Sequence, residues 1–229
     1  MAKSKIDFDD FTVQYNDLIQ KGTSFFTKND QYFSEYKVNI VKQELNSDVS
    51  VFLEYGCGIG RNIPFLKGCF PNTKIIGSDI SEASLEFARK LNPDVEFVHE
   101  TPRSMSECCF DAILVVGVLH HVQVKERVAV VRSLFRKLKP GGTVFIFEHN
   151  PYNPVTLSIV NDCPFDEDAV LLPLAETVSL LRLAGFKVTK KRYCLFMPPV
   201  MSRMLFLEGL LQWLPLGGQY WVKATRPHD

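Results

Sequence analysis

The stretch VFLEYGCGIGRN, residues 51–62, joins a β-prone apolar run to a turn in which three glycines alternate with other residues. A glycine-rich turn between a strand and the following helix lets a ligand approach backbone N–H groups and the positive end of the helix dipole. The dinucleotide fingerprint has the order G-x-G-x-x-G. Here the order is G-x-G-x-G, with Arg61 in the place of the last dinucleotide glycine. The turn therefore favours a nucleotide-like ligand other than a dinucleotide.

A carboxylate follows the next β-prone run. Asp79 ends this run in KIIGSDIS, 19 residues after Gly60. At the end of a second strand, a carboxylate can accept hydrogen bonds from both hydroxyls of a ribose. Together the two features predict a nucleoside, with a small zwitterion over the glycines in place of a pyrophosphate. The alternative is a tight strand-to-helix turn with an incidental aspartate.

Short β-prone runs alternate with helical patterns along the chain. The runs are VSVFLEY, TKIIGSD, VEFVHE, FDAILVVG, GTVFIFEH and FKVTKKRY, with a last one at QYWVKAT. Between them, apolar residues recur at three- and four-residue steps, with Ser81 as an expected N-cap and Gly185 as an expected helix end. This alternation predicts an α/β fold: a doubly wound, Rossmann-like sheet of seven mostly parallel strands with helices on both faces.

The composition indicates a cytoplasmic protein. The 229 residues, 46% of them hydrophobic, support one domain with a sizeable core. The 26 basic and 26 acidic side chains cancel, so no overall field favours nucleic acid or an anionic membrane. The six cysteines lack zinc-ribbon or CxxC spacing, and no stretch has the length of a membrane span. We expect reduced thiols and neither a nucleic-acid partner nor a membrane span.

The segments that lie outside the alternating strands and helices are candidates for covering a substrate. We expect a single domain over residues 1–229, divided into four parts. These are an N-terminal helical cap (1–48), a ligand-binding core (49–193), a helical insert or lid (194–218), and the last strand with the tail (219–229).

A helix is predicted within residues 201–218, MSRMLFLEGLLQWLPLGG. Its side chains are mostly apolar, and Glu208 and Gln212 form a narrow polar stripe on it. A helix that is apolar around most of its circumference must bury it. We expect this helix to pack against the N-terminal segment, with Trp213 buried. The alternatives are a lid over a hydrophobic acceptor and contact with a bilayer surface.

Four motifs in this order resemble those of the class I S-adenosylmethionine-dependent methyltransferases. FLEYGCGIG is similar to the first motif, GSDIS to the second, FDAILVVGVLHHV to the fourth-strand motif, and LFRKLKPGGTVFIFE to the helix and fifth strand. The similarity covers about residues 35–190. It implies that the last strand is antiparallel, that S-adenosylmethionine is the cofactor and S-adenosylhomocysteine the product, and that no metal is needed.

The resemblance also implies roles for individual residues. Glu54, in place of a more usual aspartate, would help hold the methionine amino group, Asp79 the ribose, and Ile80 the adenine. Thr101 stands where the family often has an acidic residue for the adenine amino group, and Glu100 precedes it. The expected cofactor-binding residues are Tyr15, Lys37, Glu54, Gly56, Cys57, Gly58, Gly60, Asp79, Ile80, Thr101 and Val116.

Histidines that follow two of the strands are the candidates for chemistry. Methyl transfer is an in-line displacement that needs alignment and, for an oxygen acceptor, a base. His149 ends the fifth strand, and an ordinary imidazole pKa of about 6.5 suits a base. His121 follows the fourth strand beside His120. His121 and His149 are therefore the catalytic candidates; the alternatives are a cofactor-shaping role for His121 and a structural role for His149.

The sequence thus predicts an S-adenosylmethionine-dependent methyltransferase, monomeric or homodimeric, that acts on a small-molecule, lipid or saccharide acceptor. EHNPYNP followed by CPFDEDAVLL also resembles bacterial methyltransferases of polysaccharide, lipid or secondary-metabolite pathways. The alternatives are a non-catalytic S-adenosylmethionine-binding module and an NAD-dependent oxidoreductase, which the glycine spacing disfavours. Methylation on oxygen, nitrogen or carbon stays open.

Overall fold

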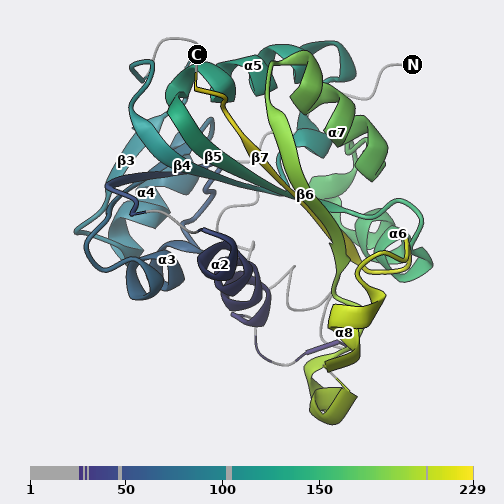
Figure 1. Ribbon diagram of the computed structural model, residues 1–229. Helices are drawn as coiled ribbons and strands as arrows, with labels where there is room; N and C mark the ends of the chain where they lie inside the picture. The colour runs from purple at the N-terminus through teal and green to yellow at the C-terminus, as the bar shows by residue number, and fades with distance from the viewer. Residues whose placement is uncertain are drawn as a thin grey trace.

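Seven strands form one sheet in the order β3-β2-β1-β4-β5-β7-β6 (Figure 1). The computed structural model describes residues 26–27, 29, 31–45, 48–101, 105–204 and 206–228. The strands are β1 (Val51–Tyr55), β2 (Lys74–Asp79), β3 (Glu96–His99), β4 (Phe110–Val116), β5 (Leu138–His149), β6 (Lys187–Cys194) and β7 (Gln219–Thr225). β7 runs antiparallel to both β5 and β6, whereas β1 to β5 pair in parallel. The predicted fold class is confirmed.

Helices cover both faces of this sheet. On one face, α5 (Arg127–Lys137) and α7 (Leu174–Leu183) pack against a core that includes Leu53, Ile113 and Val144. On the other face, α2 (Tyr32–Glu44), α3 (Ile63–Cys69) and α4 (Glu82–Leu91) pack against the alternate side chains of the same strands. The helix α6 (Pro154–Asp162) follows β5. Alternate side chains of a strand point to opposite faces, which is why runs buried on both sides are apolar throughout.

Local signals place some of the helix ends. The hydroxyl of Ser81 caps α4 by accepting a hydrogen bond from the Ser84 N–H at 3.0 Å, as expected for an N-cap. Gly185, with φ of 101°, follows the end of α7. α5 ends at Lys137, and β5 begins directly at Leu138 and runs through Pro140.

The insert between β6 and β7 differs from its prediction. It contains a short 3-10 segment (Pro199–Met204) and α8 (Phe206–Leu211), which projects from the lower end of the sheet in Figure 1. Trp213 lies beyond α8 and is 74% exposed, so its predicted burial is wrong. No helix in the described part of the chain is long and apolar enough to cross a membrane.

A buried carboxylate explains this orientation of α8. Glu208 accepts hydrogen bonds from the Tyr36 hydroxyl (2.5 Å) and from the backbone N–H groups of Phe196 (2.9 Å) and Met197 (3.1 Å). Three donors offset the cost of burying the carboxylate, so the polar stripe faces inward. The insert therefore does contact the N-terminal helix α2, as expected, but through Glu208, while Leu210 and Trp213 are exposed to solvent.

Candidate functional site

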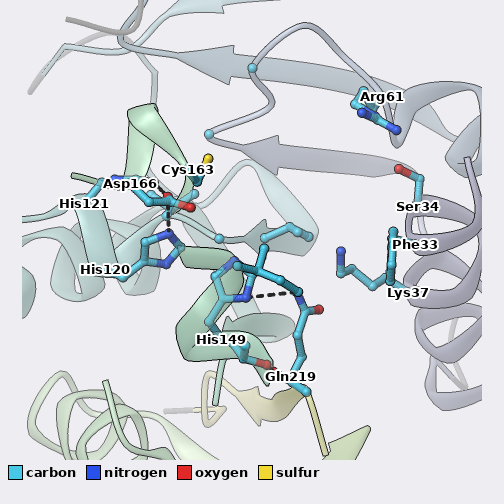
Figure 2. Close-up of a pocket in the computed structure, with 18 of the residues that line it drawn as sticks. Phe33, Ser34, Lys37, Arg61, His120, His121, His149, Cys163, Asp166 and Gln219 are labelled. Carbon is cyan, nitrogen blue, oxygen red and sulfur yellow. Dashed lines mark hydrogen bonds and ion pairs between the residues drawn. The ribbon is translucent and has the colours of Figure 1, made fainter. Parts of the chain in front are cut away.

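A cavity of about 1510 Å³ lies beyond the carboxyl ends of the parallel strands (Figure 2). The last residues of β1, β2, β4 and β5 all line it: Tyr55, Asp79, Val116 and His149. The parallel register brings these ends together, with Tyr55 opposite Ser78 on β2 and Val115 on β4. Ligand pockets commonly have volumes of about 300–1,000 Å³. This cavity therefore has room for two molecules, a cofactor and an acceptor.

The glycine turn forms one wall of the cavity. Gly56, Gly58 and Gly60 have φ angles of 70°, 52° and 80°, a region that other residues rarely adopt. A Cβ atom at Gly60 would lie 3.0 Å from the Asn92 side chain, so this glycine serves the packing of the turn on α4. A Cβ atom at Gly58 would meet nothing within 4 Å. Because Gly58 lines the cavity, its missing side chain leaves space for a ligand.

A buried carboxylate and a buried ammonium group reach the same cavity. Glu54 accepts a hydrogen bond from the Asn62 amide through Oε1 (2.6 Å), while Oε2 is buried without a hydrogen-bond partner among the described residues. Burial raises the pKa of Glu54 to about 8. Burial likewise lowers the pKa of Lys37, on α2, to about 8. An acidic and a basic group that both lack solvent match the amino and carboxylate groups of a zwitterion.

Asp79 links the glycine turn to the helix that follows β2. Its Oδ2 accepts a hydrogen bond from the Gly58 N–H (2.7 Å), and its Oδ1 accepts one from the Ser81 N–H (2.9 Å). Each carboxylate oxygen has a second lone pair, so Asp79 retains acceptor capacity toward a ribose. Ile80 lies beside it in the lining and is 53% exposed, as a surface for a flat ring would be.

The acidic side chain after β3 is Glu100. It lines the cavity, whereas Thr101 does not. Its Oε1 accepts a hydrogen bond from Lys137 Nζ at 2.6 Å, and its Oε2 is buried without a hydrogen-bond partner in the described part of the chain. Glu100 is therefore better placed than Thr101 to accept from an adenine amino group.

The structure brings most of the predicted site residues to this one cavity. The residues in its lining are Lys37, Glu54, Gly56, Cys57, Gly58, Asp79, Ile80, Val116, His121 and His149. Gly60 and Thr101 are not part of the lining. Tyr15 lies outside the described residues. In Figure 2, Lys37 and Arg61 lie across the cavity from His120 and His121.

Charged groups surround the histidines at that end of the cavity. Burial alone would lower the pKa of His120, but the charge of Glu148 and the contact with Asp166 outweigh it and raise this pKa to about 9. Burial would raise the pKa of Asp166, yet its contacts with His120 and His121 hold it well below its usual range. Sequence reasoning missed Asp166 and Glu148; the only signals were their places in CPFDED and directly before His149.

His149 differs in its ionisation from the sequence-based expectation. Its Nδ1 lies 3.4 Å from the Gln219 side-chain nitrogen, and its ring centroid lies 5.2 Å from that of His120. Burial, followed by the positive charge of His120, lowers the pKa of His149 to about 4. The ring is therefore neutral near pH 7 and is a weaker base than an ordinary imidazole.

A buried arginine holds together the two segments that carry this cluster. Arg127 Nε donates to the carbonyl oxygens of Leu119 and Val122 (3.1 Å each). Its terminal nitrogens donate to the Glu176 carboxylate (2.8 Å) and to the carbonyl oxygen of Val170 (2.5 Å). Arg127 thereby joins the turn after β4 to the segment after α6. Sequence reasoning missed this residue because it stands in an ordinary polar helix start.

Comparisons with known proteins identify relatives of part of the chain. The family described as "Methyltransferase domain" matches residues 52–142. A tRNA (carboxymethyluridine(34)-5-O)-methyltransferase of Saccharomyces cerevisiae is 33% identical over 43% of this chain and 35% of its own length. A carboxy-S-adenosyl-L-methionine synthase of Campylobacter curvus is 25% identical over 63% of this chain and 62% of its own. The chain thus spans less than two thirds of these curated relatives.

The fold has solved counterparts over nearly its whole length. A crystal structure of an S-adenosylmethionine-dependent methyltransferase from Archaeoglobus fulgidus aligns with a TM-score of 0.68 and 15% identity, covering 89% of this chain and 97% of that one. The open space at Gly58, the unpartnered Glu54 Oε2 and the placement of Asp79 fit S-adenosylmethionine. Motifs, fold and sequence similarity together show that the chain contains a class I methyltransferase domain, whose methyl donor is S-adenosylmethionine.

Proposed function

We propose that this chain transfers the methyl group of S-adenosylmethionine to a small-molecule acceptor. The observation that carries the proposal is one continuous cavity of about 1510 Å³. The glycine turn, Glu54 and Asp79 line one part of it, and His149 and Asp166 line another. When bound, S-adenosylmethionine supplies an electrophilic methyl group.

The residues of this chain contribute mainly position and shape. Glu54 binds the amino group and Lys37 the carboxylate of the methionine part, while Asp79 binds the ribose. Each of these side chains belongs to a helix or strand whose packing restricts its movement, which is what alignment of two reactants requires. The buried surroundings of Glu54 and Lys37 also keep water from competing for the two ligand charges.

The charge of the acceptor end favours a small molecule over a nucleic acid. Four carboxylates line this part of the cavity, from Glu126, Asp162, Asp166 and Asp168. Nucleic-acid sites instead gather Lys and Arg, because the phosphate backbone dominates the affinity. The relative from S. cerevisiae acts on tRNA according to its name, so the acceptor has to be tested directly.

Ligand binding and turnover test the proposal separately. Calorimetry should show that S-adenosylmethionine and S-adenosylhomocysteine bind while NAD does not. The protein is then incubated with methyl-labelled S-adenosylmethionine and fractions of a small-molecule extract. One fraction should gain the label while S-adenosylhomocysteine is formed, whereas added RNA should gain no label. Binding without label transfer to any fraction would favour the non-catalytic module, and label in RNA would overturn the small-molecule acceptor.

Cofactor binding is expected to release a proton from Glu54. The raised pKa of about 8 keeps this carboxyl protonated near pH 6 in the free protein. A bound ammonium group favours the ionised form, so the affinity for S-adenosylhomocysteine should increase as the pH rises from about 6 to about 8, by at most about 10-fold per pH unit. Calorimetry in two buffers with different ionisation enthalpies measures the released proton.

Glu54→Gln is the matched variant for this prediction, since it keeps the shape and removes the titration. We expect weaker binding whose affinity no longer increases between about pH 6 and about pH 8. A wild-type affinity that is independent of pH over this range would contradict the assignment of Glu54 to the amino group.

His149→Ala is expected to lower turnover by about 100-fold, with the affinity for S-adenosylhomocysteine changed less than about twofold. The side chain lines the acceptor part of the cavity, and its neutral ring can accept a hydrogen bond from an acceptor. Because the pKa of His149 is about 4, this contribution should be lost only as the pH falls through about 4. Release of S-adenosylhomocysteine with the identified acceptor is the measurement.

His228→Ala provides the control, because His228 is exposed near Gly141 at the start of β5, away from the cavity. Turnover of this variant should equal that of the wild type. If His149→Ala lowers affinity and turnover by the same factor, His149 belongs to the cofactor site. If His121→Ala alone affects turnover, the order of the two catalytic candidates is reversed.

A further inference from the structure

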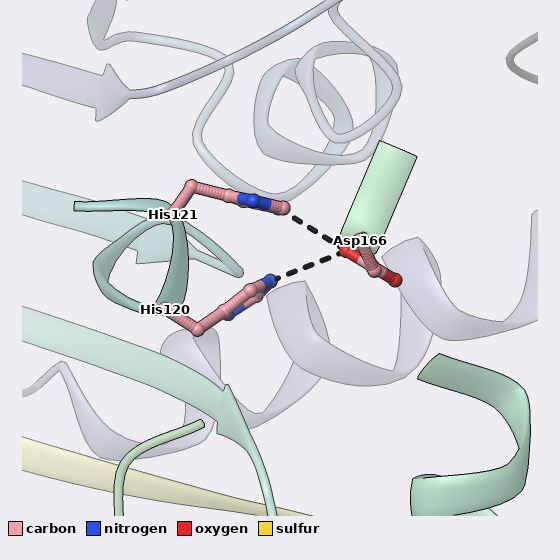
Figure 3. Close-up of side chains that lie close together, drawn as sticks. All are labelled: His120, His121 and Asp166. Atoms are coloured by element: carbon pink, nitrogen blue, oxygen red, sulfur yellow. Dashed lines mark ion pairs between the residues drawn. The ribbon is translucent and has the colours of Figure 1, made fainter. Parts of the chain in front are cut away.

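Two histidines and one aspartate converge at the acceptor end of the cavity (Figure 3). His120 and His121 lie in the 3-10 turn after β4 (Leu119–His121), and Asp166 lies in the 3-10 turn after α6 (Pro164–Asp166). Asp166 Oδ1 is 3.3 Å from His121 Nε2 and 3.7 Å from His120 Nε2. One ligand atom from each residue falls within 4.8 Å of the other two.

Further carboxylates lie beside both imidazole rings. Glu148 Oε2 lies 2.5 Å from His120 Nδ1, and Glu148 Oε1 accepts hydrogen bonds from the backbone N–H groups of Val118 (3.1 Å) and Leu119 (2.7 Å). Asp168 Oδ1 lies 3.6 Å from His121 Nδ1. Each ring therefore has a carboxylate on its Nδ1 side and presents Nε2 toward Asp166. In metal-binding histidines the second nitrogen donates to a carboxylate that fixes the tautomer and the ring orientation, as Glu148 does for His120, while Asp168 lies near His121 beyond hydrogen-bond distance.

We propose that His120 Nε2, His121 Nε2 and Asp166 bind one divalent transition-metal ion such as Zn²⁺. Two imidazoles and a carboxylate suit a first-row transition metal, whereas Mg²⁺ and Ca²⁺ prefer oxygen ligands. The separations of Asp166 Oδ1 from the two Nε2 atoms, 3.3 and 3.7 Å, are close to those between ligands of an ion bound at about 2.0–2.2 Å, and all three ligand atoms lie within 4.8 Å of one another. This proposal replaces the sequence-based expectation of no metal, since the third ligand lies 45 residues beyond His121 in the chain.

Three protein ligands leave at least one coordination position for another molecule, as in catalytic metal sites. This position opens into the cavity, since all three ligands line it and His149 lies beside His120. A bound metal ion lowers the pKa of an oxygen that it coordinates. If the proposed methyl transfer holds, the acceptor is therefore a compound that binds through a hydroxyl, enol or carboxylate oxygen, and oxygen is the methylated atom.

Cobalt spectroscopy tests the site without any turnover. Tag-free full-length protein, freed of metal by chelation, is titrated with Co²⁺, whose visible absorption reports coordination by protein ligands. We expect one Co²⁺ per chain, displaced by Zn²⁺. Asp166→Asn and His121→Ala should each weaken Zn²⁺ binding by about 100-fold or more, and Asp168→Asn by about 10-fold. His228→Ala, which changes an exposed histidine, should bind as the wild type does.

Each outcome of this experiment decides the proposal. Wild-type protein that binds S-adenosylhomocysteine but produces no Co²⁺ spectrum would overturn the metal site and leave the proposed methyl transfer standing. Metal binding that Asp166→Asn leaves unchanged would also overturn it, because the ion would then bind elsewhere. S-adenosylhomocysteine binding by each variant shows that it is folded. Acetohydroxamate, an oxygen ligand, should alter the Co²⁺ spectrum; no change would overturn the open position and with it the oxygen acceptor.

Discussion

Replacing Asp79 with alanine is expected to weaken the binding of S-adenosylhomocysteine by about 100-fold or more. The variant loses two hydrogen bonds from the ribose to a charged group, each contributing about 1.5–3 kcal/mol. It also loses the hydrogen bonds by which Asp79 holds the N–H groups of Gly58 and Ser81. Both losses act on the same ligand, because Gly58 lines the cavity beside Asp79. Calorimetry with S-adenosylhomocysteine measures the effect.

Asp94→Ala is the matched control for this variant. Asp94 is an exposed aspartate whose only described ion pair is with Lys67 on the surface, and it does not line the cavity. Its replacement should change the affinity by less than about twofold. An Asp79→Ala variant that binds S-adenosylhomocysteine as tightly as Asp94→Ala does would show that Asp79 does not bind the ribose.

Replacing Arg127 with methionine is expected to lower the free energy of unfolding by about 3–5 kcal/mol. Arg127 is 1% exposed, and its guanidinium group donates to three backbone carbonyl oxygens and to Glu176. Methionine fills much of the volume but leaves these acceptors without a donor, and a buried unsatisfied acceptor costs about 1–3 kcal/mol. Urea denaturation followed by circular dichroism measures the change.

Arg132→Met separates this effect from a general cost of losing an arginine in α5. Arg132 lies in the same helix and is exposed, so its replacement should change stability by less than about 0.5 kcal/mol. Arg127→Lys should be intermediate, since lysine keeps the charge but lacks the planar set of donors. Equal stabilities of Arg127→Met and Arg132→Met would contradict the structural role of Arg127.

The fold and the cofactor end of the site were readable from contiguous stretches of sequence. The β-prone run before Gly56, the glycine turn, and Asp79 at the end of the next run are local signals, and each depends on residues that are close together in the chain. Strand periodicity, the Ser81 cap and the positive φ angles of the glycines have the same local origin. These features depend on the strand-turn-helix unit itself and not on contacts with distant parts of the chain. The α/β class follows from the alternation of strands and helices, whereas the antiparallel last strand was expected only from the family resemblance.

The acceptor end of the cavity could not be predicted in this way, because it is formed by contacts between distant parts of the chain. Asp166 meets His120 and His121 only because the segment after α6 folds back over the turn after β4. The burial of Arg127, which joins these two segments, has no local signature. Glu208 faces the interior, because a carboxylate with three donors is stable inside the protein, and Trp213 is exposed instead of buried. The pKa of His149 was likewise decided by desolvation and by its neighbour His120. Sequence alone thus determined the backbone framework that receives the cofactor, since that framework is encoded locally. Tertiary structure decided the charges and ligand groups of the acceptor end, because burial and electrostatic interactions depend on what surrounds a side chain in space.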